Sequence, residues 1–172
     1  EMSYDVKVQH LLAEEHEIEV FLQRMERDRT HRYYRPTQTN FNDRVGTGIP
    51  YRTTALGPWA DEFEARFYYQ YKKDTRYFPN DLRGVATTDT FVTALQASTP
   101  PGTHRLTYGI SWERDLGESP DDEQFTTHTA HQSDYVKQAP DSIWDDIGAN
   151  IQDEREVAPK WAIIAAARVD YF

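Results

Sequence analysis

A chain of 172 residues with 38% hydrophobic and 13% aromatic residues has the length and ring content of one folded domain, which excludes a disordered chain. It contains no cysteine, so disulfides, thiol catalysis and thiolate metal sites are excluded for these residues. Its 29 acidic and 19 basic residues give a formal net charge of −10. We therefore expect a single acidic domain over residues 1–172.

The basic residues are mostly arginine, and threonine is abundant. This composition is typical of proteins from salt-loving organisms, in which molar salt screens the repulsion of like charges. An acidic protein from an organism with GC-rich DNA fits equally well. No apolar run approaches the ~20 residues that span a bilayer, so we expect a soluble chain with no membrane partner. The order Glu1-Met2 suggests that Met2 is the native start.

The first predicted element is a long amphipathic helix from Asp5 to about Arg29. Acidic residues crowd its first half and arginines its last turns, which suits the helix dipole. Its apolar residues recur at spacings of three and four. They are Val8, Leu11, Leu12, Ile18, Phe21, Leu22 and Met25.

The arginines from Arg24 to Arg35, interleaved with Tyr33 and Tyr34, would indicate a nucleic-acid patch in a functional interpretation. Glu26 and Asp28 dilute that cluster, and the whole chain is anionic. A solvated surface is therefore the favoured interpretation.

Residues 36–58 are rich in Gly, Pro, Thr and Asn, which predicts a long loop or arm with at most a short strand at Ile49–Thr54. Within it, Val45-Gly46-Thr47-Gly48 has two glycines of a phosphate cradle. It lacks the third glycine and the strand-turn-helix context, so we interpret it as a turn.

Two segments alternate strictly between apolar and polar residues, the period of a β-strand. In Glu62–Lys72 one side carries Phe63, Phe67 and Tyr71. His104–Arg114 repeats the pattern with Leu106, Tyr108, Ile110 and Trp112. Both are predicted strands with one apolar face.

The remaining elements follow in chain order. A short helix capped by Thr87 or Thr88 carries Phe91, Val92 and Leu95. Phe125–Tyr135 is a weak strand. A second short helix begins at Pro140 and bears Ile143, Trp144, Ile147 and Ile151, and Trp161–Phe172 is a last strand covered on both sides.

These elements predict an α+β domain. Its largely antiparallel sheet has four or five strands, and the long N-terminal helix and the two shorter helices pack on one face of it.

No catalytic, cofactor or metal site is predicted, although several clusters deserve a test. His128 and His131 with Asp134 offer metal ligands, but i and i+3 point to opposite faces of a strand. His10, Glu14 and Glu17 would share a helix face, more often a solvated stripe than a site. The carboxylates at 121–123 and 145–146 lack an EF-hand pattern, and His104 with Asp170 is a conceivable acid–base pair.

With no chemical motif, exposed aromatics and a terminal strand Trp161–Phe172, the element order resembles the tail-terminator or tail-completion proteins in the neck of tailed viruses. The resemblance implies a non-enzymatic virion component that assembles as a ring with itself and with other virion proteins. With the halophile-like composition, it implies a virus of haloarchaea. DNA would at most pass through the acidic lumen without sticking.

A second hypothesis is a small cone-shaped α+β enzyme or ligand carrier whose N-terminal helix closes a sheet over an aromatic pocket. The residues that could line the pocket are Phe67, Tyr69, Tyr71, His104, Tyr108 and Trp112. A ring in solution would favour the first hypothesis, and a monomer or dimer with a closed pocket the second.

Overall fold

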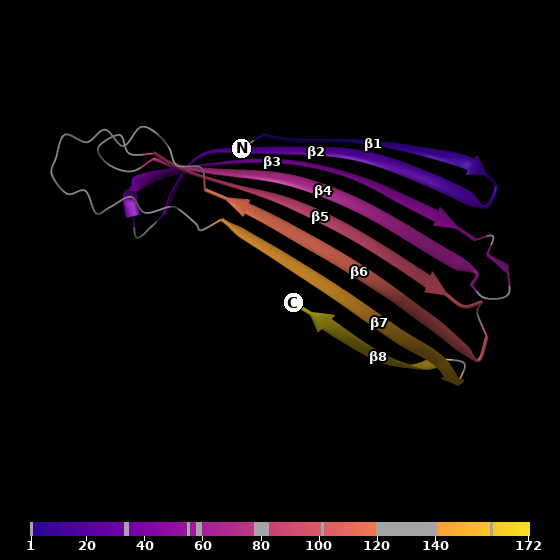
Figure 1. The fold of residues 1–172 in the computed structure, drawn as a ribbon. Coiled ribbons are helices and arrows are strands. Elements are labelled where there is room, and N and C mark those ends of the chain that lie inside the picture. Colours follow the sequence, from indigo (N-terminus) through magenta and orange to yellow (C-terminus); the bar gives the residue numbers. More distant parts are fainter. Residues whose placement is uncertain are drawn as a thin grey trace, which may run out of the picture.

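The computed structural model describes residues 2–32, 35–54, 56–57, 60–77, 83–100, 102–119, 141–158 and 160–172. Within these ranges eight strands form one sheet, in which each strand pairs antiparallel with the next. They are β1 (Met2–Ala13), β2 (His16–Arg32), β3 (Arg35–Thr53), β4 (Glu62–Tyr77), β5 (Arg83–Ser98), β6 (His104–Glu118), β7 (Ser142–Ala158) and β8 (Trp161–Tyr171). The N-terminus lies at the β1 edge and the C-terminus at the β8 edge (Figure 1).

The predicted α+β class is wrong, because the described residues form a sheet without any of the three expected helices. The N-terminal segment is a hairpin of β1 and β2 that turns at Glu14 and Glu15. Val6 and Val8 pair with Leu22 and Val20, an alternating pattern on either side of the turn. The apolar residues alternate along β1 and again along β2. Taken together across the turn, these two patterns contain spacings of three and four that resembled a helix.

The two shorter helices are also strands. In β7 the residues Ile143, Ile147 and Ile151 recur every four positions, a spacing that fits a helix face and a strand face equally. In β5, Phe91 and Leu95 have the same spacing. The neighbouring strands decide between the two, because they supply hydrogen-bond partners along the full length of both segments.

The long loop expected at 36–58 is mostly β3, which pairs with β4 from Thr39↔Tyr77 to Thr53↔Phe63. Its glycines are part of the strand. A Cβ on Gly48 would collide with the ring of Phe21, and one on Gly46 would lie 2.8 Å from the hydroxyl of Tyr68. Glycine therefore serves here for close side-chain packing and does not mark a turn.

The strands expected at 62–72, 104–114 and 161–172 are confirmed as parts of β4, β6 and β8. The expectation that the last strand is covered on both sides is wrong, since every residue of β8 is exposed. The strand expected at 125–135 lies outside the described residues.

Directly paired residues share a face of a sheet. The strand register therefore sorts the side chains onto two faces, one mostly apolar and the other mostly polar. A row of paired residues crosses it through Phe67, Thr93 and Trp112. We call the side that carries Phe67 the apolar face and the other the polar face. The large apolar side chains on the apolar face include Val6, Val8, Val20, Leu22, Ile49, Phe63, Phe67, Phe91, Leu95, Ile110, Trp112, Ile147, Ile151, Ile163 and Val169.

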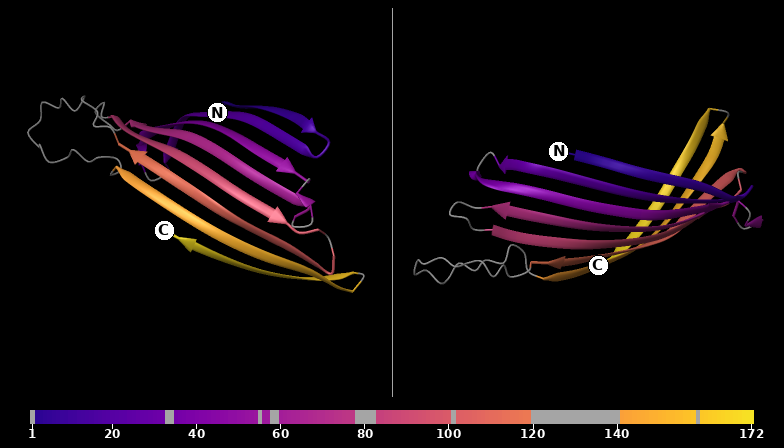
Figure 2. Two further views of the ribbon diagram at one scale, coloured as in Figure 1. Left: turned by 45° about the vertical axis from the view of Figure 1, so that its right-hand side comes forward. Right: turned by 90° about the horizontal axis from the view of Figure 1, so that it is seen from above.

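The polar face is the concave one. Every glycine within a described strand lies on it, where the side chains converge and space is short. A Cβ on Gly109 would lie 2.8 Å from the carbonyl oxygen of Leu95, and one on Gly148 2.7 Å from Asp170. Residues of β4 and β8, which have three strands between them, line one hollow on this side. Figure 2 shows the strong twist, with β7 and β8 crossing the direction of β1 to β3.

The sheet encloses almost no core. Among the described residues the buried apolar side chains are Ala60, Val85 and Ala97, all small. A compact monomer of 20.1 kDa exposes about 8,700 Å², whereas this chain exposes 12859 Å². An open, single-layered sheet explains the difference, and it leaves the apolar face without a covering layer among the described residues.

Candidate functional site

The apolar face is the most distinctive surface of the described chain. Val8 is 61% exposed, Ile110 52% and Val169 73%, although all three belong to residue types that are normally buried. Continuous apolar patches of this kind mark sites of protein or membrane interaction. We therefore treat this face as the candidate functional site.

Charged residues border the apolar face along the strands. In β4 the apolar stretch Phe63–Tyr71 ends at Lys73. In β6, Leu106–Trp112 lies between His104 and Arg114. At ~3.4 Å per residue, the nine residues of the β4 stretch extend about 27 Å. The result is an apolar belt of limited height with charges on both sides.

Trp112, Arg114 and Asp145 form a polar cluster at one border of the belt. Arg114 donates from Nε and Nη2 to the two carboxylate oxygens of Asp145, at 2.7 and 2.8 Å, and Trp112 Nε1 donates to the same carboxylate at 3.1 Å. The guanidinium also lies 5.5 Å from the centre of the Trp112 ring. The Arg114 hydrogen bonds hold the pKa of Asp145 below its usual value, with a smaller contribution from Trp112.

A second polar contact on the apolar face joins Tyr69 to Asp89. The Tyr69 hydroxyl donates to Asp89 Oδ1 at 2.5 Å. This hydrogen bond, with partial burial, raises the pKa of Tyr69 to about 12. The ring of Tyr69 also packs 5.0 Å from that of Phe91.

The polar face carries cross-strand ion pairs. Lys7 contacts Glu19 at 2.6 Å, between β1 and β2. Glu64 of β4 lies between Arg52 at 3.3 Å and Arg66 at 3.5 Å. These pairs contribute little stability each, but they place charges of both signs on this face, which also exposes Leu11, Trp144 and Ile164.

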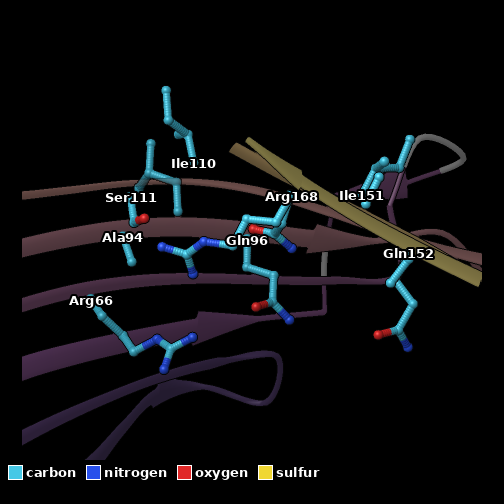
Figure 3. Close-up of a pocket in the computed structure, with 12 residues that line it drawn as sticks. Arg66, Ala94, Gln96, Ile110, Ser111, Ile151, Gln152 and Arg168 are labelled. Carbon is cyan, nitrogen blue, oxygen red and sulfur yellow. The ribbon is translucent and has the colours of Figure 1, made fainter. Parts of the chain in front are cut away.

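A hollow of about 490 Å³ lies on the polar face over β4 to β8. Figure 3 shows Arg66 and Arg168 extending into it from opposite sides, with Gln96 between them. The other lining residues include small or amide-bearing ones, such as Ala94, Ser111 and Gln152, and also Leu95, Ile110 and Ile151. Arg168 is held by Asp170 through a hydrogen bond of 2.7 Å.

Both edge strands are free within the described chain, because the sheet order ends at β1 and at β8. Every residue of these two strands is exposed. Long edge strands normally carry proline, bulges or inward-pointing charges that prevent further pairing. Such protection is sparse here, with one irregularity near Leu11 and no proline in either strand.

The clusters singled out from the sequence are not brought together. His10 lies on the apolar face, whereas Glu17 lies on the polar face, where it accepts a hydrogen bond of 2.5 Å from Gln9. His104 contacts Asp153 at 2.9 Å and not Asp170, which lies on the other face. The first grouping assumed a helix, and the second would need His104 and Asp170 on the same face of the sheet.

Other candidates have simple outcomes. Asp145 and Asp146 point to opposite faces, so they cannot share an ion. The metal cluster of His128, His131 and Asp134 and the carboxylates at 121–123 lie outside the described residues. Of the suggested nucleic-acid patch, Arg24 is paired with Glu26 and lies 3.8 Å from Asp43.

The aromatic residues expected to line a pocket do gather on one face, but it is the convex one. Among them, Tyr108 lines a shallow hollow of about 290 Å³, together with Phe63, Leu95 and Ile110. The closing helix of that hypothesis is the β1–β2 hairpin. The second hypothesis therefore loses both its lid and its closed cavity.

The described residues hold no group of three or more metal-ligating side chains of the His, Cys, Asp and Glu types. They also contain no helix with the length and apolar character needed to cross a membrane. No family model, curated protein or solved structure matches this chain.

Proposed function

We propose that the chain is a non-enzymatic structural protein that assembles with copies of itself through its two free strand edges. The observation that carries the proposal is the pair of long, sparsely protected edges at opposite sides of one sheet. An unpaired edge is a template for another strand. Pairing of β8 in one copy with β1 in the next is a head-to-tail contact, which closes into a ring when the rotation permits.

One register joins these edges over their whole length. When Met2 faces Tyr171 in antiparallel pairing, Leu12 faces Trp161, and the two strands overlap completely. This register keeps the apolar face continuous, because Val6 then faces Ala167. It also places Asp5 opposite Arg168 on the polar face, a favourable cross-strand charge pair.

The finer proposal is a ring in the neck of a tailed virus, with DNA passing through its lumen. The acidic composition and the terminal strand support it. The N-terminal helix that contributed to the resemblance is a hairpin, so this finer role has less support than the assembly itself.

Engineered disulfides test the proposed register directly, because the chain has no cysteine of its own. Lys7→Cys and Ala166→Cys face each other in it, whereas Lys7→Cys and Ala162→Cys are offset by about 14 Å along the strand at ~3.4 Å per residue. Cysteines whose Cα atoms are more than ~7 Å apart cannot be bridged. The offset pair is therefore the matched control.

The two single variants are mixed and oxidised, and the products are separated without reductant. The proposal expects a Lys7→Cys to Ala166→Cys heterodimer in high yield and little product from the offset control. A double variant should then give a ladder ending at one closed species. A disulfide formed only within one chain, or equal yields for both pairs, would contradict the homo-oligomer.

A further inference from the structure

We propose that lipid acyl chains cover the apolar face, so that the belt between the two charged borders lies in the hydrocarbon of a bilayer. The proposed function concerns the edges of the sheet, and this inference concerns its face. Edge pairing and lipid contact are independent, because a face can meet lipid whether the edges pair within one chain or between copies. The finer role in a virus neck and a face covered by lipid, in contrast, exclude each other.

The chain exposes more surface than the pairing of its two edges can cover. A compact monomer of this mass exposes about 4,000 Å² less than this chain does. Pairing of two strand edges covers mainly backbone and adjacent side chains. The middle of the sheet, with Phe67 and Ile110 both more than 40% exposed, would remain uncovered. Something other than edge pairing must cover it.

The convex shape of the apolar face favours a fluid partner over a second sheet. The glycines and the shared hollow place the concave side at the polar face, so the apolar face is convex. Two convex sheets touch over a small area and cannot interdigitate as the flat sheets of a sandwich do. A fluid hydrocarbon phase, in contrast, follows any convex surface. Lipid therefore fits this face better than a second copy stacked on it.

The height of the apolar belt matches the length of a membrane-crossing strand. Membrane-crossing strands need ~9–11 residues, and the apolar stretch of β4 from Phe63 to Tyr71 has that length. Trp112 and Tyr69 carry polar tips that bond to carboxylates at the border. Tryptophan and tyrosine are enriched where hydrocarbon meets water, because one end of each ring system is apolar and the other polar.

Charged residues lie on the polar face or at the borders of the apolar face. The sites at 7, 19, 52, 64, 66 and 105 all lie on the polar face, away from the belt. The charges that do lie on the apolar face stand at its borders, as Lys73 and Arg114 do. A surface designed for water would not sort charge in this way. The expectation of a soluble chain rested on continuous apolar runs, which an alternating strand does not produce.

Two tryptophans offer a matched test, since Trp112 lies on the apolar face and Trp144 on the polar face of the neighbouring strand. Variants that retain one of them, with the other tryptophans changed to phenylalanine, are refolded from urea with phosphatidylcholine vesicles brominated on the acyl chains. Bromine quenches indole emission at close range. The proposal expects most of the Trp112 emission to be lost and most of the Trp144 emission to remain.

Substitutions on adjacent residues of β6 give a second measurement. Ile110→Asp places a charge in the middle of the apolar face, and Ser111→Asp places the same charge on the polar face. Ile110→Asp should abolish flotation with vesicles on a density gradient, whereas Ser111→Asp should float like the wild type. Equal quenching of both tryptophans, or a wild type that stays monodisperse in water and does not float, would overturn the proposal.

Discussion

Arg114 holds Asp145 across β6 and β7 with two parallel hydrogen bonds, and Trp112 donates a third to the same carboxylate. Asp145 sits opposite Arg114 in the strand register, 31 residues along the chain. This bidentate pair occupies the border of the apolar belt, where a lone carboxylate would face hydrocarbon on one side. It anchors that border by satisfying both charges locally.

The first prediction concerns the titration of Asp145. Because Arg114 stabilises the carboxylate, the pKa of Asp145 is lowered from 3.8. The contribution of this pair to stability is therefore present above pH 3.8 and is lost as the pH falls through the lower folded-state pKa. Arg114→Gln should return the midpoint toward 3.8, and Trp112→Phe should move it less. Carboxyl NMR titration measures both, and an unchanged midpoint in Arg114→Gln would refute the cause.

A second prediction concerns alkaline pH. Tyr69 has a pKa raised from 10.0 to about 12 because its hydroxyl donates to Asp89. Because this pKa is higher in the folded state, protonated Tyr69 contributes stability that is fully present below pH 10. That contribution is lost as the pH rises through about 12. Tyr69→Phe should flatten the fall in stability over this window. Asp89→Asn should lower the tyrosine midpoint, measured by absorbance, and no change in that variant would exclude the carboxylate as the cause.

Gly109 gives a prediction about the crowded polar face. A Cβ there would lie 2.8 Å from the backbone oxygen of Leu95, which cannot rotate away. Gly109→Ala should therefore lower the free energy of unfolding by ~1–3 kcal/mol. In Gly46→Ala the nearest atom is the hydroxyl of Tyr68, at the end of a side chain that can move. Denaturant unfolding should show the smaller loss for Gly46→Ala, and the reverse order would mean that the backbone oxygen of Leu95 does not limit the space at Gly109.

Salt dependence remains a prediction from composition. With a formal net charge of −10, repulsion should destabilise the fold when the Debye length grows to ~30 Å at ~10 mM salt. Circular dichroism melts at molar and millimolar salt measure the effect. An unchanged melting temperature would remove the proposed halophilic origin.

The sequence was enough to predict strands in which aromatic residues alternate with mostly charged or polar ones. Glu64, Arg66 and Gln70 alternate with Phe67 and its neighbours in β4, and only a period of two accommodates them. The N-terminal hairpin was missed because its turn at Glu14 and Glu15 contains neither glycine nor proline. Its β1 and β2 patterns therefore merged into one apparent helix.

The wrong predictions for β7 and β3 have different physical causes. In β7 the spacing of four is a multiple of the strand period and close to the helix period. The spacing of Ile143, Ile147 and Ile151 therefore does not distinguish a helix from a strand. In β3 the glycines resemble loop residues, whereas Gly48 makes room for the ring of Phe21. Both depend on neighbouring strands that the sequence does not identify.

For the candidate site, alternation was enough to predict an apolar side for β4 and β6. The size of the whole face could not be predicted, because it requires the order of all eight strands. The Arg114–Asp145 pair likewise depends on the β6–β7 register. A hydrophobic face also looks the same in sequence whether a helix, a second sheet or lipid covers it.

The central claim is a sheet whose apolar face meets lipid, and a nitroxide scan along β7 tests it most directly. Each residue from Ser142 to Glu156 is replaced in turn by a spin-labelled cysteine in vesicles, and its collisions with oxygen and with a water-soluble nickel complex are compared. The account predicts a period of two, with oxygen favoured at Ile147, Ala149 and Ile151 and nickel at Gly148, Asn150 and Gln152. A period of 3.6 would restore the helix expected from the sequence, and nickel access at every position would exclude lipid from this face.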